Sequence, residues 1–203
     1  MTGPIDLRII ELIAARLCHD LIGPISAVNH GVELVDDESP DFIRDAVALV
    51  ADSALKATRR LQFYRFAFGY RGGGLAGSAP HILATDYFNG TSVACDYSAE
   101  AREMPLEQQK LACVMLTLAA EGLPRGGKLV LGAGADGPQI DAAGDGTGPS
   151  ADARAALALT APVDDLTSRT VGGYFAGLLA DRLGCRLVVI DRSGGFSLVT
   201  EPA

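Results

Sequence analysis

The stretch from Leu7 to Val35, LRIIELIAARLCHDLIGPISAVNHGVELV, decides the first part of the fold. Its apolar residues recur at alternating spacings of three and four, a pattern that predicts one long helix with an apolar stripe along one side. The stripe consists of Leu7, Ile10, Ala14, Leu17, Leu21, Ile25, Val28, Val32 and Val35. At 1.5 Å per residue, a helix of about 30 residues is about 45 Å long.

A second apolar stripe follows the turn at 36–39, where Ser39 is a suitable N-cap and Pro40 suits the first helical position. This stripe consists of Ile43, Val47, Val50, Ala54, Ala57, Leu61, Tyr64 and Phe68. The short connection predicts two antiparallel helices. A lone hairpin leaves part of each stripe in water, so we expect a homodimer in which two hairpins form a four-helix bundle. The alternative is that the hairpin packs on the rest of its own chain.

Beyond a glycine-rich stretch, the pattern becomes a mixture of helices and strands. We expect helices at 81–88, 106–123, 151–160 and 169–183, and strands at 91–97, 128–133, 139–143, 186–190 and 196–199. Helices interleaved with hairpins favour an α/β sandwich with a largely antiparallel sheet. The sequence therefore predicts an α+β protein, with a helical hairpin at 1–70, a glycine-rich linker at 71–80 and the sandwich at 81–203.

The composition excludes several classes of protein. The chain has 203 residues, is 48% hydrophobic and 21% charged, and carries a net charge of −8. It is too apolar for a disordered chain, and its negative charge argues against nucleic acid or an anionic membrane as a partner. No apolar run approaches the ~20 residues that span a bilayer, and no signal peptide is visible. The four cysteines are widely spaced, which fits reduced thiols in a cytoplasmic protein.

His19 lies midway along the first predicted helix, two residues from both Leu17 and Leu21 of the apolar stripe. At 100° per residue, it points away from the stripe and into solvent. Asp20 follows it directly, and Pro24 removes a backbone donor five residues later, so we expect a bend beside the histidine. A neutral imidazole can attack phosphorus while an adjacent acid orients the ring. The other interpretation is an ordinary solvated histidine, and the residues alone do not decide between them.

Basic residues are expected at the height of His19. With the turn centred between residues 37 and 38, residue 19 is level with about residue 56 of the second helix. Lys56, Arg59 and Arg60 then lie near the histidine, and Arg16 lies one turn earlier on its own helix. Such cations can offset the charge of a phosphoryl group, and a solvated helix face is the alternative.

The run Leu17-Cys-His-Asp-Leu-Ile-Gly-Pro24 resembles the H-box of dimeric histidine kinases, where a histidine, an adjacent acid and a proline five residues later surround the phospho-accepting ring. Those kinases usually carry Thr or Asn at the position of Gly23, a residue tied to phosphatase activity, so the departure argues against that activity. An ATP-binding domain should follow. Here Thr117 and Glu121 occupy the expected Asn positions, no Asp-x-Gly-x-Gly motif follows, and the glycine-rich lid is reduced to Gly172-Gly173.

This combination resembles the ChpT-like histidine phosphotransferases of alphaproteobacteria, from about Leu12 to the C-terminus. The resemblance is carried by three runs: Arg16-Leu-Cys-His-Asp-Leu-Ile-Gly-Pro24, Ala119-Ala-Glu-Gly-Leu-Pro-Arg-Gly-Gly127 and Val171-Gly-Gly-Tyr-Phe-Ala-Gly-Leu-Leu-Ala180. It implies a kinase-like dimer whose second domain is a degenerate ATPase that binds no ATP. Such a protein takes a phosphoryl group from the receiver domain of a hybrid kinase and passes it to response regulators such as CtrA and CpdR. It needs no cofactor of its own, because Mg²⁺ comes with the receiver.

By this resemblance His19 is the phosphorylated residue, with Asp20 beside it and Pro24 as a structural part of the motif. The expected docking surface for receivers consists of Arg16, Ile22, Gly23, Ser26 and Ala27 on the first helix, with Lys56, Arg59 and Arg60 on the second. Two other functions stay open. One is an active histidine kinase with divergent ATP motifs, and the other is a non-enzymatic dimerisation or scaffold module.

Other candidate motifs have simpler interpretations. The run from Gly132 to Gly137 matches Gly-x-Gly-x-x-Gly, but a strand rather than a helix follows it, so we interpret it as a hairpin turn. Cys18 is interpreted as structural, and His30 and His81 as ordinary polar residues.

Overall fold

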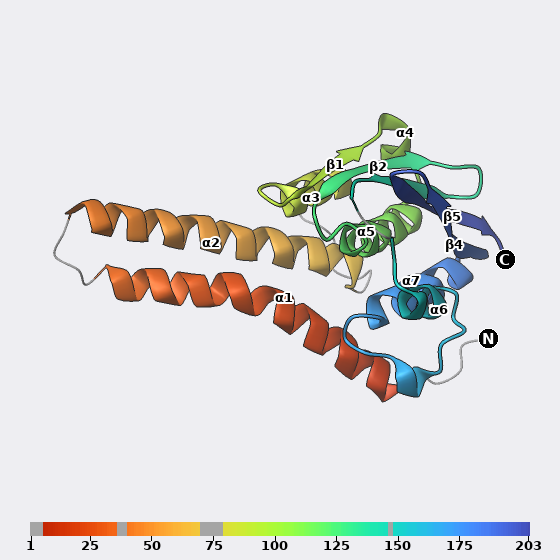
Figure 1. Cartoon of the computed structure of the whole chain (residues 1–203), viewed down its shortest axis with the longest axis horizontal. Helices are drawn as coiled ribbons and strands as arrows, with labels where there is room; N and C mark the ends of the chain where they lie inside the picture. The colour runs from red at the N-terminus through yellow and green to blue at the C-terminus, as the bar shows by residue number, and fades with distance from the viewer. Residues whose placement is uncertain (1–5, 36–39, 70–78, 146–147) are drawn as a thin grey trace.

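Two long helices form an antiparallel hairpin that projects from the rest of the molecule (Figure 1). The computed structural model describes residues 6–35, 40–69, 79–145 and 148–203. Helix α1 spans Leu7–Leu34 and α2 spans Pro40–Ala67. The turn predicted at 36–39 and nearly all of the linker predicted at 71–80 lie outside the described residues.

A five-stranded sheet forms the centre of the second part. In spatial order its strands are β1 (Val93–Tyr97), β2 (Gly127–Ala133), β3 (Pro138–Ala143), β5 (Gly195–Pro202) and β4 (Cys185–Arg192). Strands β1 and β2 pair in parallel, and all the other pairs are antiparallel. The predicted largely antiparallel sheet is therefore confirmed. So is the predicted hairpin turn between β2 and β3, where the Gly134 amide donates to the Gly137 carbonyl at 2.7 Å.

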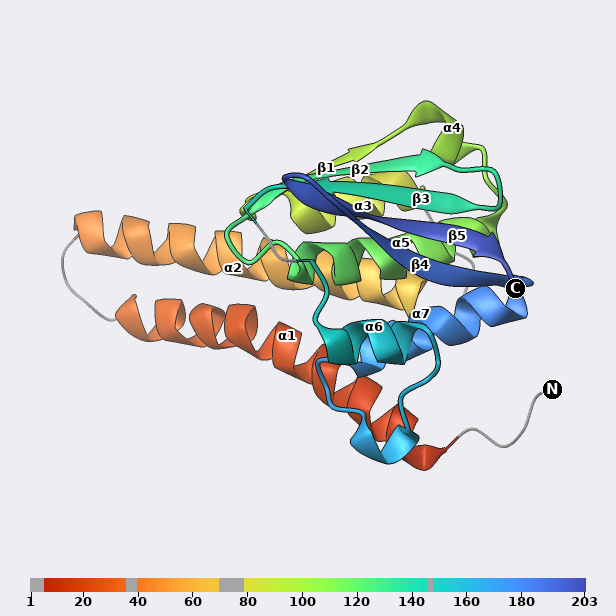
Figure 2. The same ribbon diagram turned by 45° about the vertical axis from the view of Figure 1, so that its right-hand side comes forward.

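Helices cover the face of the sheet that looks toward the hairpin, as Figure 2 shows. The helices after the hairpin are α3 (Pro80–Phe88), α4 (Ala99–Arg102), α5 (Leu106–Glu121), α6 (Ala151–Leu157), the 3-10 turn η1 (Val163–Asp165) and α7 (Val171–Arg182). The single-turn α4 and η1 were not predicted. They are too short to have an apolar period of their own.

Helix α5 lies at the middle of the core, between the sheet and the hairpin. Every residue from Leu111 to Ala119 is buried. The end of α2 belongs to the same core, because Phe63 and Ala67 have no exposed surface. The base of the hairpin is therefore packed on its own chain, whereas its far end is not.

The structure corrects the predicted stripe at the start of α1. Leu7 and Ile10 are 65% and 55% exposed, and Ile9 is buried instead, in a small cluster with Leu166 and Val171. The segment that leads into α7 covers this side of α1. The stripe was defined by spacing within one helix, which carries no information about a segment more than 150 residues away.

Candidate functional site

His19 lies on the exposed side of α1, above a cleft between the hairpin and the second part of the molecule. Its side chain is 86% exposed. The cleft has a volume of about 670 Å³ and is lined by α1, α2, Tyr87 of α3, the C-terminal end of α5, α6 with the loop before it, and the segment before α7. The predicted orientation of His19 away from the packed face is confirmed. The ring is open to a reactant as large as another protein domain.

Asp20 holds a defined position beside this ring. One carboxylate oxygen, Oδ1, lies 3.4 Å from His19 Nδ1. The other, Oδ2, accepts a hydrogen bond of 2.7 Å from the hydroxyl of Tyr64 on α2. The Tyr64 hydroxyl also lies 3.1 Å from that of Tyr87 on α3. A carboxylate at Nδ1 favours the tautomer with the proton on that nitrogen, which leaves the Nε2 lone pair free.

Both tyrosines stay protonated at neutral pH. Burial raises the pKa of the Tyr64 hydroxyl far above its usual value, and Tyr87 and Asp20 raise it further. Burial likewise raises the pKa of Tyr87. The Tyr64 hydroxyl is therefore a permanent donor to the carboxylate of Asp20.

Pro24 lies inside α1, which bends in its middle part (Figure 1). A proline has no amide hydrogen, so the carbonyl four residues earlier, that of Asp20, loses its helical partner. Arg60 Nη1 donates to this carbonyl oxygen at 2.5 Å. The bend predicted from Pro24 is thus accompanied by a contact from α2 that replaces the missing hydrogen bond.

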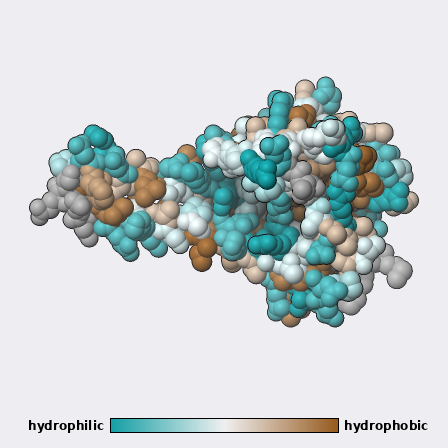
Figure 3. Space-filling model, viewed as in Figure 1, coloured by the Kyte–Doolittle hydropathy of each residue, from teal (hydrophilic) through white to brown (hydrophobic). Residues whose placement is uncertain are grey.

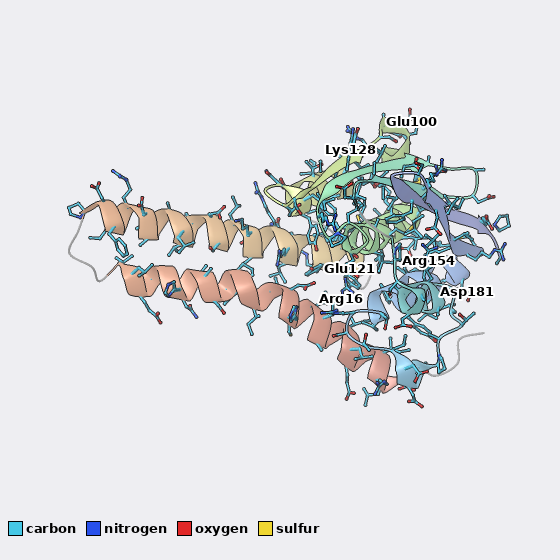
Figure 4. All side chains as sticks on the ribbon, viewed as in Figure 1. Arg16, Glu100, Glu121, Lys128, Arg154 and Asp181 are labelled. Atoms are coloured by element: carbon cyan, nitrogen blue, oxygen red, sulfur yellow. The ribbon has the colours of Figure 1, made fainter. Side chains whose placement is uncertain are left out.

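Arg16 connects α1 to the second part of the molecule. Its side chain is 11% exposed; Nη2 pairs with Glu121 at the end of α5, and Nη1 donates to the Arg169 carbonyl at 3.2 Å. Figure 4 shows the Arg16 and Glu121 side chains pointing toward one another. Gly172 makes room for this contact, because a Cβ there would lie 3.0 Å from Arg16 Nη1. The Gly-Gly pair at 172–173 therefore lies at a packing contact, within α7.

The predicted cluster of cations around His19 is only partly present. Arg60 lines both the cleft and a smaller cavity of about 260 Å³ beside α3, whereas Lys56 and Arg59 line only the smaller cavity. Lys56 pairs with Asp52 at 2.7 Å. The predicted level of the two helices was off by about one turn, since Gly31 lies against Ala46 and Val50 rather than beside residue 44. Arg60, one of the three predicted cations, does contact Asp20.

The two helices approach each other closely at Gly31, which restricts how they can pair. A Cβ at Gly31 would lie 2.7 Å from Val50 Cγ2 and 3.3 Å from the Ala46 carbonyl oxygen. Only glycine fits between α1 and α2 at this point. The level of His19 against α2 follows from this contact.

The other residues of the predicted docking surface lie on the open side of α1, one to two turns from His19. Ile22 is 63% exposed, and a Cβ at Gly23 would meet no atom within 4 Å. Ser26 is exposed and Ala27 is half-buried. These residues form one accessible surface, and their role in binding stays a prediction, as does that of Arg16, Lys56, Arg59 and Arg60.

The positions expected to bind a nucleotide's magnesium have other partners. The Thr117 hydroxyl donates to the Val114 carbonyl at 2.8 Å inside the core, and Glu121 pairs with Arg16. In the described ranges, no group of three or more His, Cys, Asp and Glu side chains is arranged to hold a metal ion. None of the described helices is both long and apolar enough to cross a bilayer.

Sequence reasoning missed Tyr64 and Tyr87. Tyr64 was assigned to the apolar stripe of the second helix, where its ring is indeed buried. The signal available in the sequence was its hydroxyl, since a buried tyrosine usually finds a hydrogen-bond partner. Its partner could not be predicted, because the level of α1 against α2 was misplaced.

Comparisons with known proteins agree with this arrangement. Residues 80–193, more than half of the chain, match the family model for the histidine phosphotransferase C-terminal domain. Protein phosphotransferase ChpT of Brucella abortus (strain 2308) is 35% identical over an alignment 138 residues long. The match covers 64% of this chain and 65% of that protein, slightly less than two thirds of its length. A solved structure of a bacterial phosphotransferase matches 98% of both chains, with a TM-score of 0.76 and 26% identity. The chain therefore belongs to the ChpT-like family of histidine phosphotransferases.

Proposed function

We propose that this protein relays a phosphoryl group between the aspartates of receiver domains, through a phosphohistidine at His19. The observation that carries the proposal is the pairing of a ring that is 86% exposed with an adjacent carboxylate at Nδ1. An exposed ring is accessible to the active site of another protein. A carboxylate at Nδ1 leaves the outer nitrogen, Nε2, as the nucleophile.

The transfer needs few protein groups, because an aspartyl phosphate is already a reactive acyl phosphate. The Nε2 lone pair of His19 attacks phosphorus, the N–P bond forms, and the bond from phosphorus to the donor aspartate breaks. The ring then carries positive charge, which the Asp20 carboxylate stabilises through the Nδ1 proton. In the second step an aspartate of the acceptor receiver attacks the same phosphorus, and His19 leaves as neutral imidazole. The Mg²⁺ that offsets phosphoryl charge arrives with the receiver.

ATP takes no part in this proposal. The support is that Thr117 and Glu121, at the two positions expected for a magnesium-binding Asn, are already engaged within the fold. We further propose that receivers dock on the open side of α1 around Ile22 and Gly23. Ser26 and Ala27 extend this surface, and its basic residues are Arg16, Lys56, Arg59 and Arg60. The donor is then the receiver of a hybrid kinase, and the acceptors are response regulators of the CtrA and CpdR kind, in the cytoplasm.

A homodimer is the expected assembly. The hairpin exposes large apolar side chains along both helices, among them Ile25, Val32, Val47 and Leu61. Figure 3 shows hydrophobic patches on the projecting hairpin. An apolar groove of about 450 Å³ between α1 and α2, lined by Leu17, Leu21, Leu61 and Phe68 among others, continues this surface toward the base. A second hairpin would cover these side chains in a four-helix bundle.

The test is transfer from a receiver domain carrying labelled aspartyl phosphate. Wild-type protein should gain label in an acid-labile, alkali-stable form, as expected for phosphohistidine, whereas His19→Ala should gain none. His30→Ala is the matched control, because His30 is an exposed histidine on the same helix, and it should label like wild type. Equal labelling of wild type and His19→Ala would falsify the assignment.

Two outcomes would favour the other functions. Labelling from γ-labelled ATP in the absence of any receiver would make the protein a histidine kinase with divergent motifs. Receiver binding that survives His19→Ala, with no phosphohistidine formed in wild type, would make it a scaffold.

A further inference from the structure

Helix α2 holds Asp20 at two atoms. Arg60 Nη1 donates to its backbone carbonyl at 2.5 Å, and the Tyr64 hydroxyl donates to its Oδ2 at 2.7 Å. Arg60 and Tyr64 are four residues apart, so they lie on one face of α2, one above the other. The first contact depends on Pro24, which leaves that carbonyl without a helical partner. Backbone and side chain of Asp20 are thus fixed by neighbouring residues of one facing helix.

The hydrogen bond from Tyr64 to Asp20 Oδ2 determines which carboxylate oxygen faces His19. Because Oδ2 is bonded to Tyr64, the carboxylate is turned so that Oδ1 is the oxygen nearest His19 Nδ1, at 3.4 Å. The Asp20 side chain is 30% exposed. Without the tyrosine it would be able to rotate toward water and away from the ring.

Tyr64 is itself held in place by α3 and by aromatic neighbours at the end of α2. Its hydroxyl lies 3.1 Å from that of Tyr87 on α3, and the Tyr87 ring stacks on Phe63 with centroids 4.2 Å apart. Tyr64 also meets Phe63 and Phe68 edge to face, with centroid distances of 6.0 and 5.9 Å. A ring packed on several sides keeps one rotamer, so its hydroxyl is a fixed donor.

We propose that Tyr64 is a positioning residue for phosphotransfer: it sets the Asp20 carboxylate so that His19 keeps its proton on Nδ1 and presents Nε2 as the nucleophile. The inference deepens the proposed function and rests on it for its biological meaning. Tyr64 does not touch the reacting phosphorus. It acts through Asp20, and the α3 helix of the second part of the molecule contributes by holding the tyrosine.

The variant that tests the inference is Tyr64→Phe, which removes the hydroxyl and keeps the ring in the core. Tyr97→Phe is the matched control, because it removes the hydroxyl of another buried tyrosine, one in β1 that donates to Gln109 Oε1 at 3.3 Å rather than to Asp20 or Tyr64. Both full-length variants should keep the far-ultraviolet circular dichroism of wild type. The first readout is the tautomer of His19, measured from the ¹⁵N shifts of its ring nitrogens in protein labelled at histidine, with the signal assigned through His19→Ala.

The second readout is the rate at which phosphoramidate phosphorylates His19. In this reaction the P–N bond of phosphoramidate breaks, ammonia leaves, and a bond forms between phosphorus and Nε2, so no receiver is required. Wild type and Tyr97→Phe should show the Nδ1–H tautomer and similar rates. Tyr64→Phe should show a mixture of tautomers and a rate lower by about tenfold, the order expected for losing a hydrogen bond to a charged group. The same loss should appear in transfer from a phosphorylated receiver.

A double variant separates positioning from general packing. In an Asp20→Ala background the tautomer is already lost, so adding Tyr64→Phe should change the phosphoramidate rate by less than about twofold. An additive loss in that background, or equal losses in Tyr64→Phe and Tyr97→Phe, would overturn the inference. So would a Tyr64→Phe protein with the tautomer and rate of wild type. These readouts do not depend on the relay: if no receiver labels wild-type His19, the proposed function fails while the tautomer spectra still report on Tyr64.

Discussion

The hairpin and the second part of the molecule differ in how they are held together. Of the 28 residues of α1, only Ile9 and Gly31 are buried, whereas ten of the 16 residues of α5 are buried. Helix α5 is surrounded by protein on nearly all sides. Helix α1 is covered at its start and along one line of contact with α2, and carries exposed apolar side chains elsewhere.

This difference explains where the functional groups lie. His19, the phosphoryl acceptor that we propose, is on the sparsely packed element, where its side chain is 86% exposed. Tyr64, which we propose positions Asp20, and its neighbour Tyr87 belong to the densely packed base, where side chains keep one rotamer. A ring that another protein must reach has to be exposed, whereas the residues that orient it have to be tightly packed. Both conditions are met where the hairpin joins the second part of the molecule.

The largest expected difference between the two parts is the loss of stability when one leucine in each is shortened to alanine. Leu129→Ala in β2, where the leucine has no exposed surface, should lower the free energy of unfolding by about 2–5 kcal/mol. Leu61→Ala in α2, where the leucine is 58% exposed, should change it by less than about 1 kcal/mol in the isolated chain. Chemical denaturation at a concentration too low for self-association gives both values.

Leu61→Ala has a second expected effect. If the exposed stripe is the surface between two copies, truncating it in both copies should weaken self-association by at least about tenfold. Sedimentation at a series of concentrations measures this, with Leu106→Ala as control, because Leu106 is 55% exposed but lies outside the hairpin. A wild-type protein that stays monomeric at all concentrations would contradict the dimer.

The sequence predicted the elements of the second part well because burial there follows local patterns. Helix α5 was predicted to end at residue 123 and ends at Glu121, because its last turn tightens: the amides of Gly122 and Leu123 donate to the carbonyls three residues earlier. The contact between Ile9 and the segment before α7 was not predictable, because it joins distant parts of the chain.

The candidate site likewise contains residues that the sequence predicts and residues that it does not. His19 and Asp20 could be found from one run of eight residues, because neighbours on a helix have known directions. The roles of Arg60 and Tyr64 could not, since they depend on the level of α1 against α2. The close approach at Gly31 restricts how α1 pairs with α2. Shifting one helix by one turn would place different residues of α2 beside His19.

A smaller effect should follow from breaking the connection between the two parts. Arg16→Ala removes the pair with Glu121 and the bond to the Arg169 carbonyl. Because Arg16 is mostly buried but Glu121 is 46% exposed, we expect a loss of about 1–2 kcal/mol in the free energy of unfolding. Arg186→Ala is the control, since its pair with Glu201 is more open to solvent, and it should cost less than about 0.5 kcal/mol. Equal losses would mean that the Arg16 pair is no stronger than a surface pair.

The smallest perturbation is chemical modification of cysteine thiols. It compares the accessibility of the hairpin with that of the second part without any mutation. Cys18 is exposed on α1 beside His19, whereas Cys113 is buried in α5 and Cys95 is half-buried in β1. Burial raises the pKa of Cys95 to about 12 and also raises that of Cys113, so at pH 8 both carry little thiolate, the form that reacts. Iodoacetamide should therefore modify Cys18 first, with one label per native chain and four after denaturation.

Modification at Cys18 should also slow phosphotransfer while leaving the unfolding transition nearly unchanged, because the added group lies next to the reactive ring and outside the core. Cys18→Ser is the control: it should transfer phosphoryl groups like wild type and be insensitive to the reagent. Mass spectrometry of digested protein locates the label. Early labelling at Cys95 or Cys113 would show that the second part opens as readily as the hairpin, and the contrast between a rigid base and an accessible helix would then fail.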